Sequence, residues 1–165
     1  MNLILIGFMG SGKSTLARSL SSLFHFHLVE MDELVYQKTK TSNMHEVFAL
    51  GGEKLLREME LCIAQEYAGK TNQVISTGGG IVLDPTPLNI FKQAGARIIF
   101  LNAPFDLVAK RLEHDRSRPL FTHLAQAKKI YEDRLPLYLQ AADEIINIEN
   151  QSPYELALII QVRSL

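Results

Sequence analysis

The chain is constrained most strongly by a glycine-rich segment of eight residues near its N-terminus. Residues 7–14 read GFMGSGKS, which is the P-loop pattern of glycine, four residues, glycine, lysine, and serine or threonine. The segment follows a short apolar run at Asn2 to Ile6, which is typical of a strand buried on both faces. It leads directly into STLARSLSSLF, whose apolar residues recur at helical spacing. This pattern, placed between a strand and a helix, predicts a phosphate-binding loop.

Each part of this loop has a chemical role toward a nucleotide. Glycines let the backbone turn so that successive N–H groups point at phosphate oxygens, and the following helix adds the positive end of its dipole. Lys13 is expected to reach the β- and γ-phosphates, and Ser14 to ligate Mg²⁺ through its hydroxyl. The loop leaves the acceptor open, because water, a nucleotide or a small metabolite can each receive the phosphoryl group. ATP and Mg²⁺ are thus expected at Gly10, Ser11, Gly12, Lys13, Ser14 and Thr15.

The remaining short apolar runs predict a parallel sheet. They are separated by helical patterns, and this alternation implies right-handed crossovers with helices on both faces of the sheet. We expect an α/β fold of three layers, α/β/α, with a five-stranded parallel sheet and ligands at the carboxyl ends of the strands. The 165 residues, 47% of them hydrophobic, suffice for a single domain over 1–165. The other strand candidates are His27 to Glu30, Gln73 to Ser76, Ile98 to Leu101 and Glu144 to Ile148.

A helix-capping motif, the net charge and the lack of long apolar stretches give further expectations about the structure and the partners of the protein. Residues 152–155 read SPYE, a capping box with Pro153 at the first helical position. The 17 basic and 18 acidic side chains give a net charge of −1, which argues against a nucleic-acid partner. The sequence shows neither a leader nor an apolar stretch of membrane-spanning length, so we expect no membrane partner and a cytoplasmic location. We expect a monomer, because no exposed apolar stripe is apparent.

Cysteine and histidine usage predicts no zinc centre. The single cysteine, Cys62, cannot form an intramolecular disulfide, and its place among apolar residues at helical spacing predicts a small buried side chain. The five histidines show no ligand spacing joined to a cysteine. We therefore look for the chemistry in carboxylates, glycines and arginines.

Two carboxylates stand where the second expected strand ends. Glu30 and Asp32 are two residues apart, so their side chains leave the same face if the strand continues that far. Such a pair near a P-loop can orient water on Mg²⁺ and align an attacking hydroxyl. The alternative is that Asp32 is only the N-cap of the following helix. Spacing alone leaves both interpretations open.

Three consecutive glycines, Gly78, Gly79 and Gly80, follow the expected strand QVIS after Thr77. Such a run costs conformational entropy unless the backbone takes unusual dihedral angles or approaches something closely. A substrate lying against this segment would supply the reason. The alternative is a flexible turn before the helix PLNIFKQ.

Two arginines are candidates for binding an anionic acceptor. Arg57 lies beside Glu53 and Glu58 on an amphipathic helix, and its alternative role is an ordinary surface ion pair. Arg134 precedes Pro136, and a proline within a helical pattern kinks the helix where a side chain can point inward. Two arginines converging on one pocket would imply an anionic acceptor, because a guanidinium binds a carboxylate with two hydrogen bonds.

The longest segment without apolar periodicity is EHDRSRPLFTH, residues 113–123. A charged loop of this length in a small domain is usually functional or mobile. Together with Arg111, the loop residues Arg116 and Arg118 could close over a triphosphate, stabilise charge on the transferring group and exclude water. The alternative is a solvated basic turn paired with its own acidic residues.

Taken together, these segments resemble shikimate kinase over nearly the whole chain. The resemblance implies a P-loop kinase fold with a mobile lid at about 112–124 and substrate-binding helices at about 32–60. It also implies ATP-dependent phosphorylation of the 3-hydroxyl of shikimate, on the route to chorismate. The matching segments are GFMGSGKST at 7–15, the region of Asp32, GGEKLLREME at 51–60, STGGG at 76–80, RPL at 118–120 and RLPLY at 134–138.

The resemblance also implies a set of catalytic residues, Lys13, Asp32 and Arg118. Asp32 would contact the reacting hydroxyls, and Arg118 would reach the phosphates from the lid. Ser14 and Glu30 are the expected ligands of Mg²⁺.

The remaining implied roles concern binding. Arg57 and Arg134 would hold the carboxylate of shikimate, and the backbone of residues 78–80 would support its ring. Arg111 and Pro153 would flank the adenine, although the capping box explains Pro153 independently.

The chain departs from the family's pattern at two positions. Glu30 stands where the family usually has an aspartate, which displaces one carboxylate by about a bond length, and Leu56 stands where it has an aromatic residue. Two alternatives stay open. One is a P-loop kinase of another anionic metabolite, such as gluconate kinase, and the other is a nucleotide-binding regulatory protein without transfer chemistry.

Overall fold

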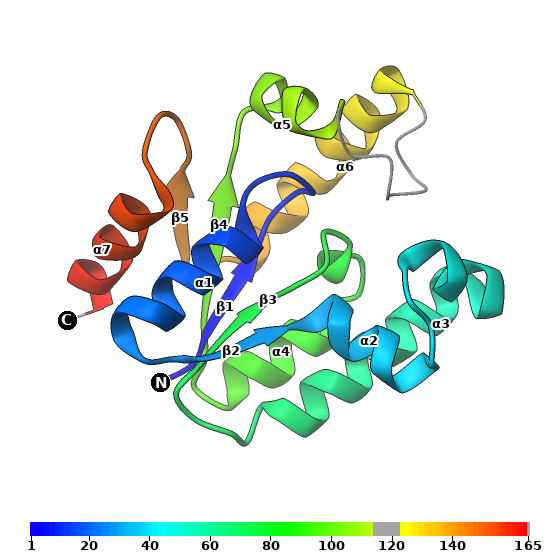
Figure 1. Cartoon of the computed structure of the whole chain (residues 1–165), viewed down its shortest axis with the longest axis horizontal. Coiled ribbons are helices and arrows are strands. Elements are labelled where there is room, and N and C mark those ends of the chain that lie inside the picture. Colours follow the sequence, from blue (N-terminus) through cyan, green and yellow to red (C-terminus); the bar gives the residue numbers. More distant parts are fainter. Residues whose placement is uncertain (114–122, 165) are drawn as a thin grey trace.

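Five parallel strands form the central sheet of the structure, a computed structural model that describes residues 1–113 and 123–164 (Figure 1). The strand order is β2-β3-β1-β4-β5, and every neighbouring pair is parallel. The number and direction of the strands confirm the prediction, and their bounds differ from it by no more than one residue. The strands are β1 (Leu3–Ile6), β2 (His27–Glu30), β3 (Gln73–Ser76), β4 (Arg97–Asn102) and β5 (Glu144–Asn147).

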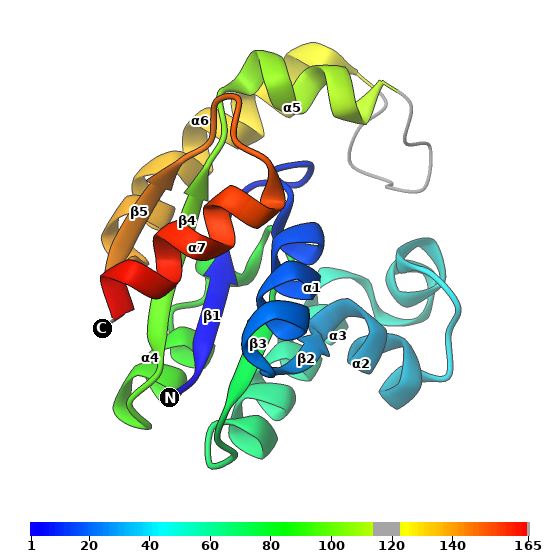
Figure 2. The ribbon, with the colours of Figure 1, turned by 60° about the vertical axis from the view of Figure 1, so that its left-hand side comes forward.

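Helices cover both faces of the sheet, which confirms the three-layer class. The helices α1 and α7 pack together on one face, and α4 and α6 lie on the other (Figure 2). Beyond the edge strand β2, α2 packs on α3. The helices are α1 (Lys13–Phe24), α2 (Met31–Thr39), α3 (Met44–Tyr67), α4 (Thr86–Gln93), α5 (Phe105–Leu112), α6 (Leu124–Ala141) and α7 (Pro153–Ser164), with a short 3-10 turn η1 (Ile81–Leu83).

The apolar core is centred on the three inner strands. All residues of β1 and β3 are buried, whereas the edge strands β2 and β5 carry exposed residues. Ile4 of β1 lies in register with Ile75 of β3 and Ile98 of β4, and all three side chains are fully buried. Continuous apolar runs are what burial on both faces of a parallel sheet requires.

The P-loop leaves the carboxyl end of β1 at the place where the strand order reverses. Strands β3 and β2 lie on one side of β1, and β4 and β5 lie on the other. Loops diverge at such a point and leave a crevice for ligands. Gly7 begins the loop with a φ of 151°, and a Cβ there would lie 2.8 Å from the carbonyl oxygen of Leu101. Only glycine fits this turn.

The capping box at the start of α7 is confirmed. The N–H of Ser152 donates to the Glu155 carboxylate at 2.7 Å, and the N–H of Glu155 donates to the Ser152 hydroxyl at 3.2 Å. Pro153 is the first residue of the helix. The local sequence thus suffices to start this helix.

The prediction of a buried cysteine is wrong, because Cys62 is exposed. The buried side of α3 includes Leu56, Glu60 and Ile63. One of these buried residues, Glu60, is a carboxylate, and a pattern of apolar residues alone does not predict its burial. The buried face of α3 is therefore rotated away from Cys62, relative to the face that the apolar spacing predicts.

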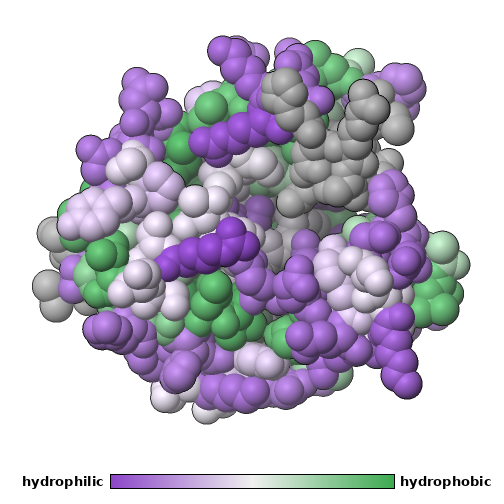
Figure 3. All heavy atoms as spheres, viewed as in Figure 1, coloured by the Kyte–Doolittle hydropathy of each residue, from purple (hydrophilic) through white to green (hydrophobic). Residues whose placement is uncertain are grey.

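Most apolar side chains lie between the layers. The face in Figure 3 is mainly hydrophilic, with apolar residues in small separate areas among polar ones. Within residues 1–113 and 123–164, no helix combines the length and apolar character needed to span a membrane.

Replacing an isoleucine by alanine should lower the free energy of unfolding far more on the central strand β1 than on the edge strand β5. Ile4→Ala removes a fully buried side chain and should lower the free energy of unfolding by about 2–5 kcal/mol. Ile145→Ala makes the same chemical change on β5, where the side chain is 41% exposed, and should cost less than about 1 kcal/mol. Urea unfolding measures both values, and equal losses would contradict the central placement of β1.

Candidate active site

Two adjoining cavities lie at the carboxyl end of the sheet. The first, of about 340 Å³, is lined by the P-loop, the start of α1 and the ends of β2 and β3. The second, of about 650 Å³, is lined by α2, α3, α6 and the glycine segment after β3. We call them the phosphate cavity and the acceptor cavity. Four residues line both: Asp32, Tyr36, Gly78 and Gly79.

Side chains of α1 and α5 donate hydrogen bonds to the carbonyls of the P-loop beside the phosphate cavity. Lys13 is only 7% exposed, and its ammonium donates to the carbonyls of Gly7 at 2.7 Å and Phe8 at 3.0 Å. The Ser11 hydroxyl is buried without a hydrogen-bond partner in the described part of the chain. Arg111 of α5 donates to the carbonyl of Gly10 at 2.8 Å and so braces the loop from outside. Of these three residues, Lys13 lines the phosphate cavity, and its ammonium is the group that phosphate oxygens would bind.

Three oxygen-bearing side chains gather beside Lys13 at the ends of β2, β3 and the P-loop. The Ser14 hydroxyl donates to the Glu30 carboxylate at 2.8 Å and lies 3.2 Å from the Ser76 hydroxyl. The other Glu30 oxygen, Oε1, is 3.4 Å from the Arg18 guanidinium, and this buried atom has no hydrogen bond within the described residues. Hard oxygen donors of this kind suit Mg²⁺.

Sequence reasoning brought Ser14 and Glu30 together correctly but missed Ser76. The signal for Ser76 is positional, since it ends β3 and pairs in register with Glu30 of β2. Among the described residues, no three His, Cys, Asp or Glu side chains cluster as metal ligands. A metal at this place would therefore depend on hydroxyls and retained water.

Asp32 lies inside the first turn of α2, which begins at Met31 with Glu30 as its N-cap. The N-cap interpretation of Asp32 is therefore wrong. So is the premise that β2 continues to Asp32, because the strand ends at Glu30. Both carboxylates nevertheless line the phosphate cavity, since the turn into α2 keeps them together. Only Asp32 also lines the acceptor cavity.

The triple glycine is required by close approach and not by unusual dihedral angles. None of the three has a positive φ. A Cβ on Gly78 would lie 3.1 Å from Asp32 Oδ1, one on Gly79 would lie 3.2 Å from Met9 Cγ, and one on Gly80 would overlap the Arg57 guanidinium. The flexible-turn interpretation does not explain this crowding.

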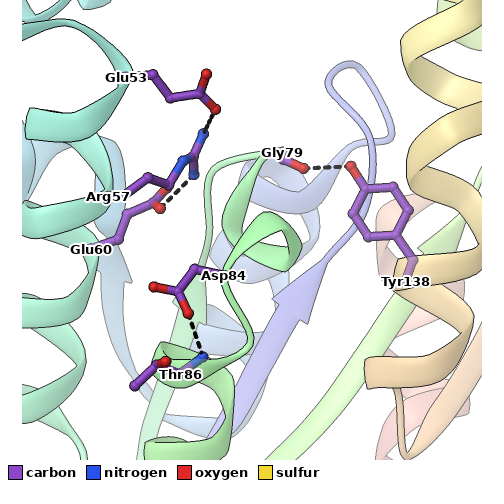
Figure 4. A network of polar contacts seen from close by, with 7 residues as sticks. All are labelled: Glu53, Arg57, Glu60, Gly79, Asp84, Thr86 and Tyr138. Carbon is purple, nitrogen blue, oxygen red and sulfur yellow. Dashed lines mark hydrogen bonds and ion pairs between the residues drawn. The ribbon is translucent and has the colours of Figure 1, made fainter.

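Arg57 projects from α3 onto Gly80 and is held by two acidic residues (Figure 4). It pairs with Glu60 at 2.5 Å and with Glu53 at 3.4 Å. The predicted neighbour Glu58 is not a partner, because successive helical residues point about 100° apart whereas those three or four apart share a face. Arg57 Nε is buried without a hydrogen bond in the described structure.

Glu60 was missed as a site residue, although its spacing of three from Arg57 was visible. Its side chain is almost fully buried and lines the acceptor cavity. Burial raises the pKa of the Glu60 carboxyl to about 7, although the adjacent Arg57 acts in the opposite direction. The carboxyl therefore titrates near neutral pH.

Arg134 enters the acceptor cavity from α6, on the opposite side from Arg57. It is 6% exposed, and its Nη1 has no hydrogen-bond partner among the described residues. Pro136 lies within the same helix, as expected. The predicted convergence of the two arginines is thus observed, and each brings a buried N–H that still lacks an acceptor. A carboxylate would supply such acceptors.

The other predicted binding residues lie outside the two cavities or outside the described residues. Arg116 and Arg118 lie outside the described residues, as does most of the expected lid. Pro153 lines neither cavity, and its adenine role remains a prediction.

Comparison with known proteins decides the family. A sequence model of shikimate kinase matches residues 9–163. The chain belongs to the shikimate kinase family. The shikimate kinase of Streptococcus gordonii is 36% identical, covering 98% of this chain and 99% of that protein. A solved shikimate kinase from Acinetobacter baumannii, in complex with shikimate, has a TM-score of 0.91 and 27% identity, covering 99% of this chain and 92% of that one.

A gluconokinase from Sinorhizobium meliloti is similar at the level of fold. Its TM-score is 0.62 at 14% identity, covering 99% of this chain and 92% of that one. Shikimate kinases therefore share a scaffold with kinases of other acceptors, and the acceptor is read from the site.

The variant Glu60→Gln should remove a pH dependence from the stability of this shikimate kinase. The folded chain keeps the Glu60 proton up to about pH 7, whereas an ordinary glutamate releases it near pH 4.5. As pH rises, the unfolded state loses this proton first, so the free energy of unfolding falls through that window. Urea unfolding from about pH 5 to pH 8 should show the difference, wild type minus variant, falling by about 2–3 kcal/mol. A constant difference would contradict the buried titration.

Proposed function

We propose that this shikimate kinase transfers the γ-phosphoryl group of ATP to the 3-hydroxyl of shikimate and releases shikimate 3-phosphate and ADP. The observation that carries the proposal is the convergence of Arg57 and Arg134, from α3 and α6, on a cavity that adjoins the P-loop. Each has a buried N–H without a partner in the described chain. A small carboxylate-bearing acceptor satisfies both, and its hydroxyl then faces the phosphates.

The nucleotide is held chiefly by backbone. The P-loop amides and the N-terminus of α1 surround the phosphates, and Lys13 exchanges its two carbonyl partners for phosphate oxygens. Arg111 keeps the loop in place through the Gly10 carbonyl. Binding of this kind neutralises charge on the transferring group, and the Lys13 ammonium changes its hydrogen-bond partners in the process.

Ser14 and Glu30 fit the role of holding Mg²⁺, with Ser76 beside them. The buried Glu30 Oε1 without a hydrogen bond in the described structure is the feature that favours this role. When bound, the ion withdraws charge from the phosphoryl oxygens. Glu30 meanwhile orients the Ser14 hydroxyl through the 2.8 Å hydrogen bond.

Asp32 is placed to act on the acceptor hydroxyl because it lines both cavities. It aligns the hydroxyl for attack on the γ-phosphorus and accepts the proton as the new oxygen–phosphorus bond forms. The bond from the γ-phosphorus to the bridging oxygen breaks, and ADP carries away that electron pair. Catalysis is thus mainly positioning and electrostatic stabilisation.

ADP release from MgATP, followed with shikimate, with gluconate or with no acceptor, tests the function directly. We expect release that depends on shikimate alone. Release with gluconate would overturn the acceptor assignment while preserving the P-loop chemistry. ATP binding without release in any arm would favour the nucleotide-binding alternative.

Removing one carboxylate-binding arginine should weaken the binding of shikimate selectively. Arg57→Ala should raise the KM for shikimate about 10- to 100-fold, because a charged hydrogen-bonded contact is lost, and should leave the KM for ATP within about twofold. Lys54→Ala removes a positive charge from the exposed side of the same helix and serves as control. Equal increases in both KM values would contradict the assigned role of Arg57.

A further inference from the structure

Tyr138 connects α6 to the glycine segment, and the reaction as proposed gives it no role. Its ring is almost fully buried and stacks on Phe100 of β4, with ring centroids 5.0 Å apart. Its hydroxyl donates to the carbonyl of Gly79 at 2.5 Å (Figure 4). Burial raises the pKa of this hydroxyl above its usual range, so it remains a donor at alkaline pH as well as at neutral pH.

This hydrogen bond fixes the orientation of one peptide plane. A trans peptide is planar, so the N–H of Gly80 points opposite to the C=O of Gly79. The carbonyl points at α6, and the N–H therefore points away from α6, the side on which Figure 4 shows Arg57. Within residues 1–113 and 123–164, the N–H of Gly80 donates to no protein group.

The glycine segment has little else to hold this plane. The carbonyl of Gly78 accepts from the N–H of Ile81 at 3.2 Å, which closes a turn with the peptide between residues 79 and 80 at its centre, and the carbonyl of Gly80 accepts from Leu83 at 3.0 Å. A turn with glycine at both central positions can hold that peptide in either of two opposite orientations. Glycines carry no Cβ that would restrict rotation. A Cβ on Gly79 or Gly80 would crowd Met9 or the Arg57 guanidinium, so in this all-glycine segment the orientation of the peptide depends on contacts with another element.

We infer that Tyr138 is a positioning residue for the acceptor: its hydroxyl holds the Gly79 carbonyl so that the Gly80 N–H faces the acceptor cavity beside Arg57. The inference rests on the proposed function, because it assigns the acceptor an additional backbone donor. Tyr138 touches no reacting atom and acts through the glycine segment. Its hydroxyl also interacts with the Arg134 side chain, so the test has to separate these two contacts. Phe100 anchors its ring, which ties the loop after β3 to β4 across the layer.

Loss of one hydroxyl tests this role. Tyr138→Phe keeps the ring on Phe100 and should raise the KM for shikimate about five- to tenfold, with the KM for ATP within about twofold. Tyr131→Phe is a matched control on the same helix, since it removes a hydroxyl that donates to the Ala103 carbonyl at 2.8 Å. It should leave both KM values within about twofold. Thermal unfolding of both variants reports any general loss of stability.

A second pair of variants separates the glycine segment from Arg134, which lies one turn before Tyr138 on α6. If Tyr138 acts through Gly79, the fold increase in KM from Tyr138→Phe should be the same in an Arg134→Lys background. If it acts by holding Arg134, the increase should disappear there, and the inference would be overturned. An unchanged KM for shikimate in Tyr138→Phe would also overturn it. Wild-type protein that fails to phosphorylate shikimate would instead overturn the proposed function.

Discussion

The carboxyl ends of β1 and β3 leave almost no room for side chains, and the geometry of the site follows from this crowding. A Cβ on Gly7 would press on the Leu101 carbonyl, and one on Gly80 would overlap Arg57. Bare backbone therefore lines the cavities where the phosphates and the acceptor meet. Backbone amides suit this position, because they donate to anions without the entropy cost of ordering a long side chain. The charged side chains, Lys13, Arg57 and Arg134, approach this backbone from three different helices.

The acceptor cavity is lined by two arginines and by four carboxyl side chains, Asp32, Glu53, Glu60 and Asp133. Glu60 holds Arg57 against the glycine segment, and its raised pKa shows how strongly burial opposes its negative charge. An ionised Glu60 beside Arg57 would cancel part of the attraction of the cavity for an anionic acceptor. A Glu60 that titrates near neutral pH opposes this attraction less than a fully ionised carboxylate would, and its contact with Arg57 still orients that guanidinium. Asp32 lines both cavities and is the carboxylate proposed to act on the acceptor hydroxyl.

Buried strands and two helices hold the P-loop and the glycine segment in place. The central strands are buried throughout, and they fix the P-loop and the glycine segment at adjacent carboxyl ends. The helices α3 and α6 then bring one arginine each from opposite walls. The glycine segment between them gains its order from neighbours, including the Tyr138 hydroxyl. Because the glycine segment is held between these elements, its N–H groups keep constant directions. Because it has no side chains, a ligand can approach its backbone closely.

The sequence by itself determined the strands, the P-loop, the capping box of α7 and the family, because each depends on short-range patterns. Each of these patterns specifies local structure through residues that are close in the chain. They are the apolar runs of the strands, the glycines of the P-loop and the serine three residues before a glutamate in the capping box. Only the tertiary structure decided that Ser76 joins Ser14 and Glu30, that Cys62 faces outward, and that Tyr138 reaches Gly79. These facts depend on which side of a helix is buried and on which strand ends lie side by side. Packing across the whole domain sets both, and no local pattern encodes contacts between residues as far apart in the chain as Gly79 and Tyr138.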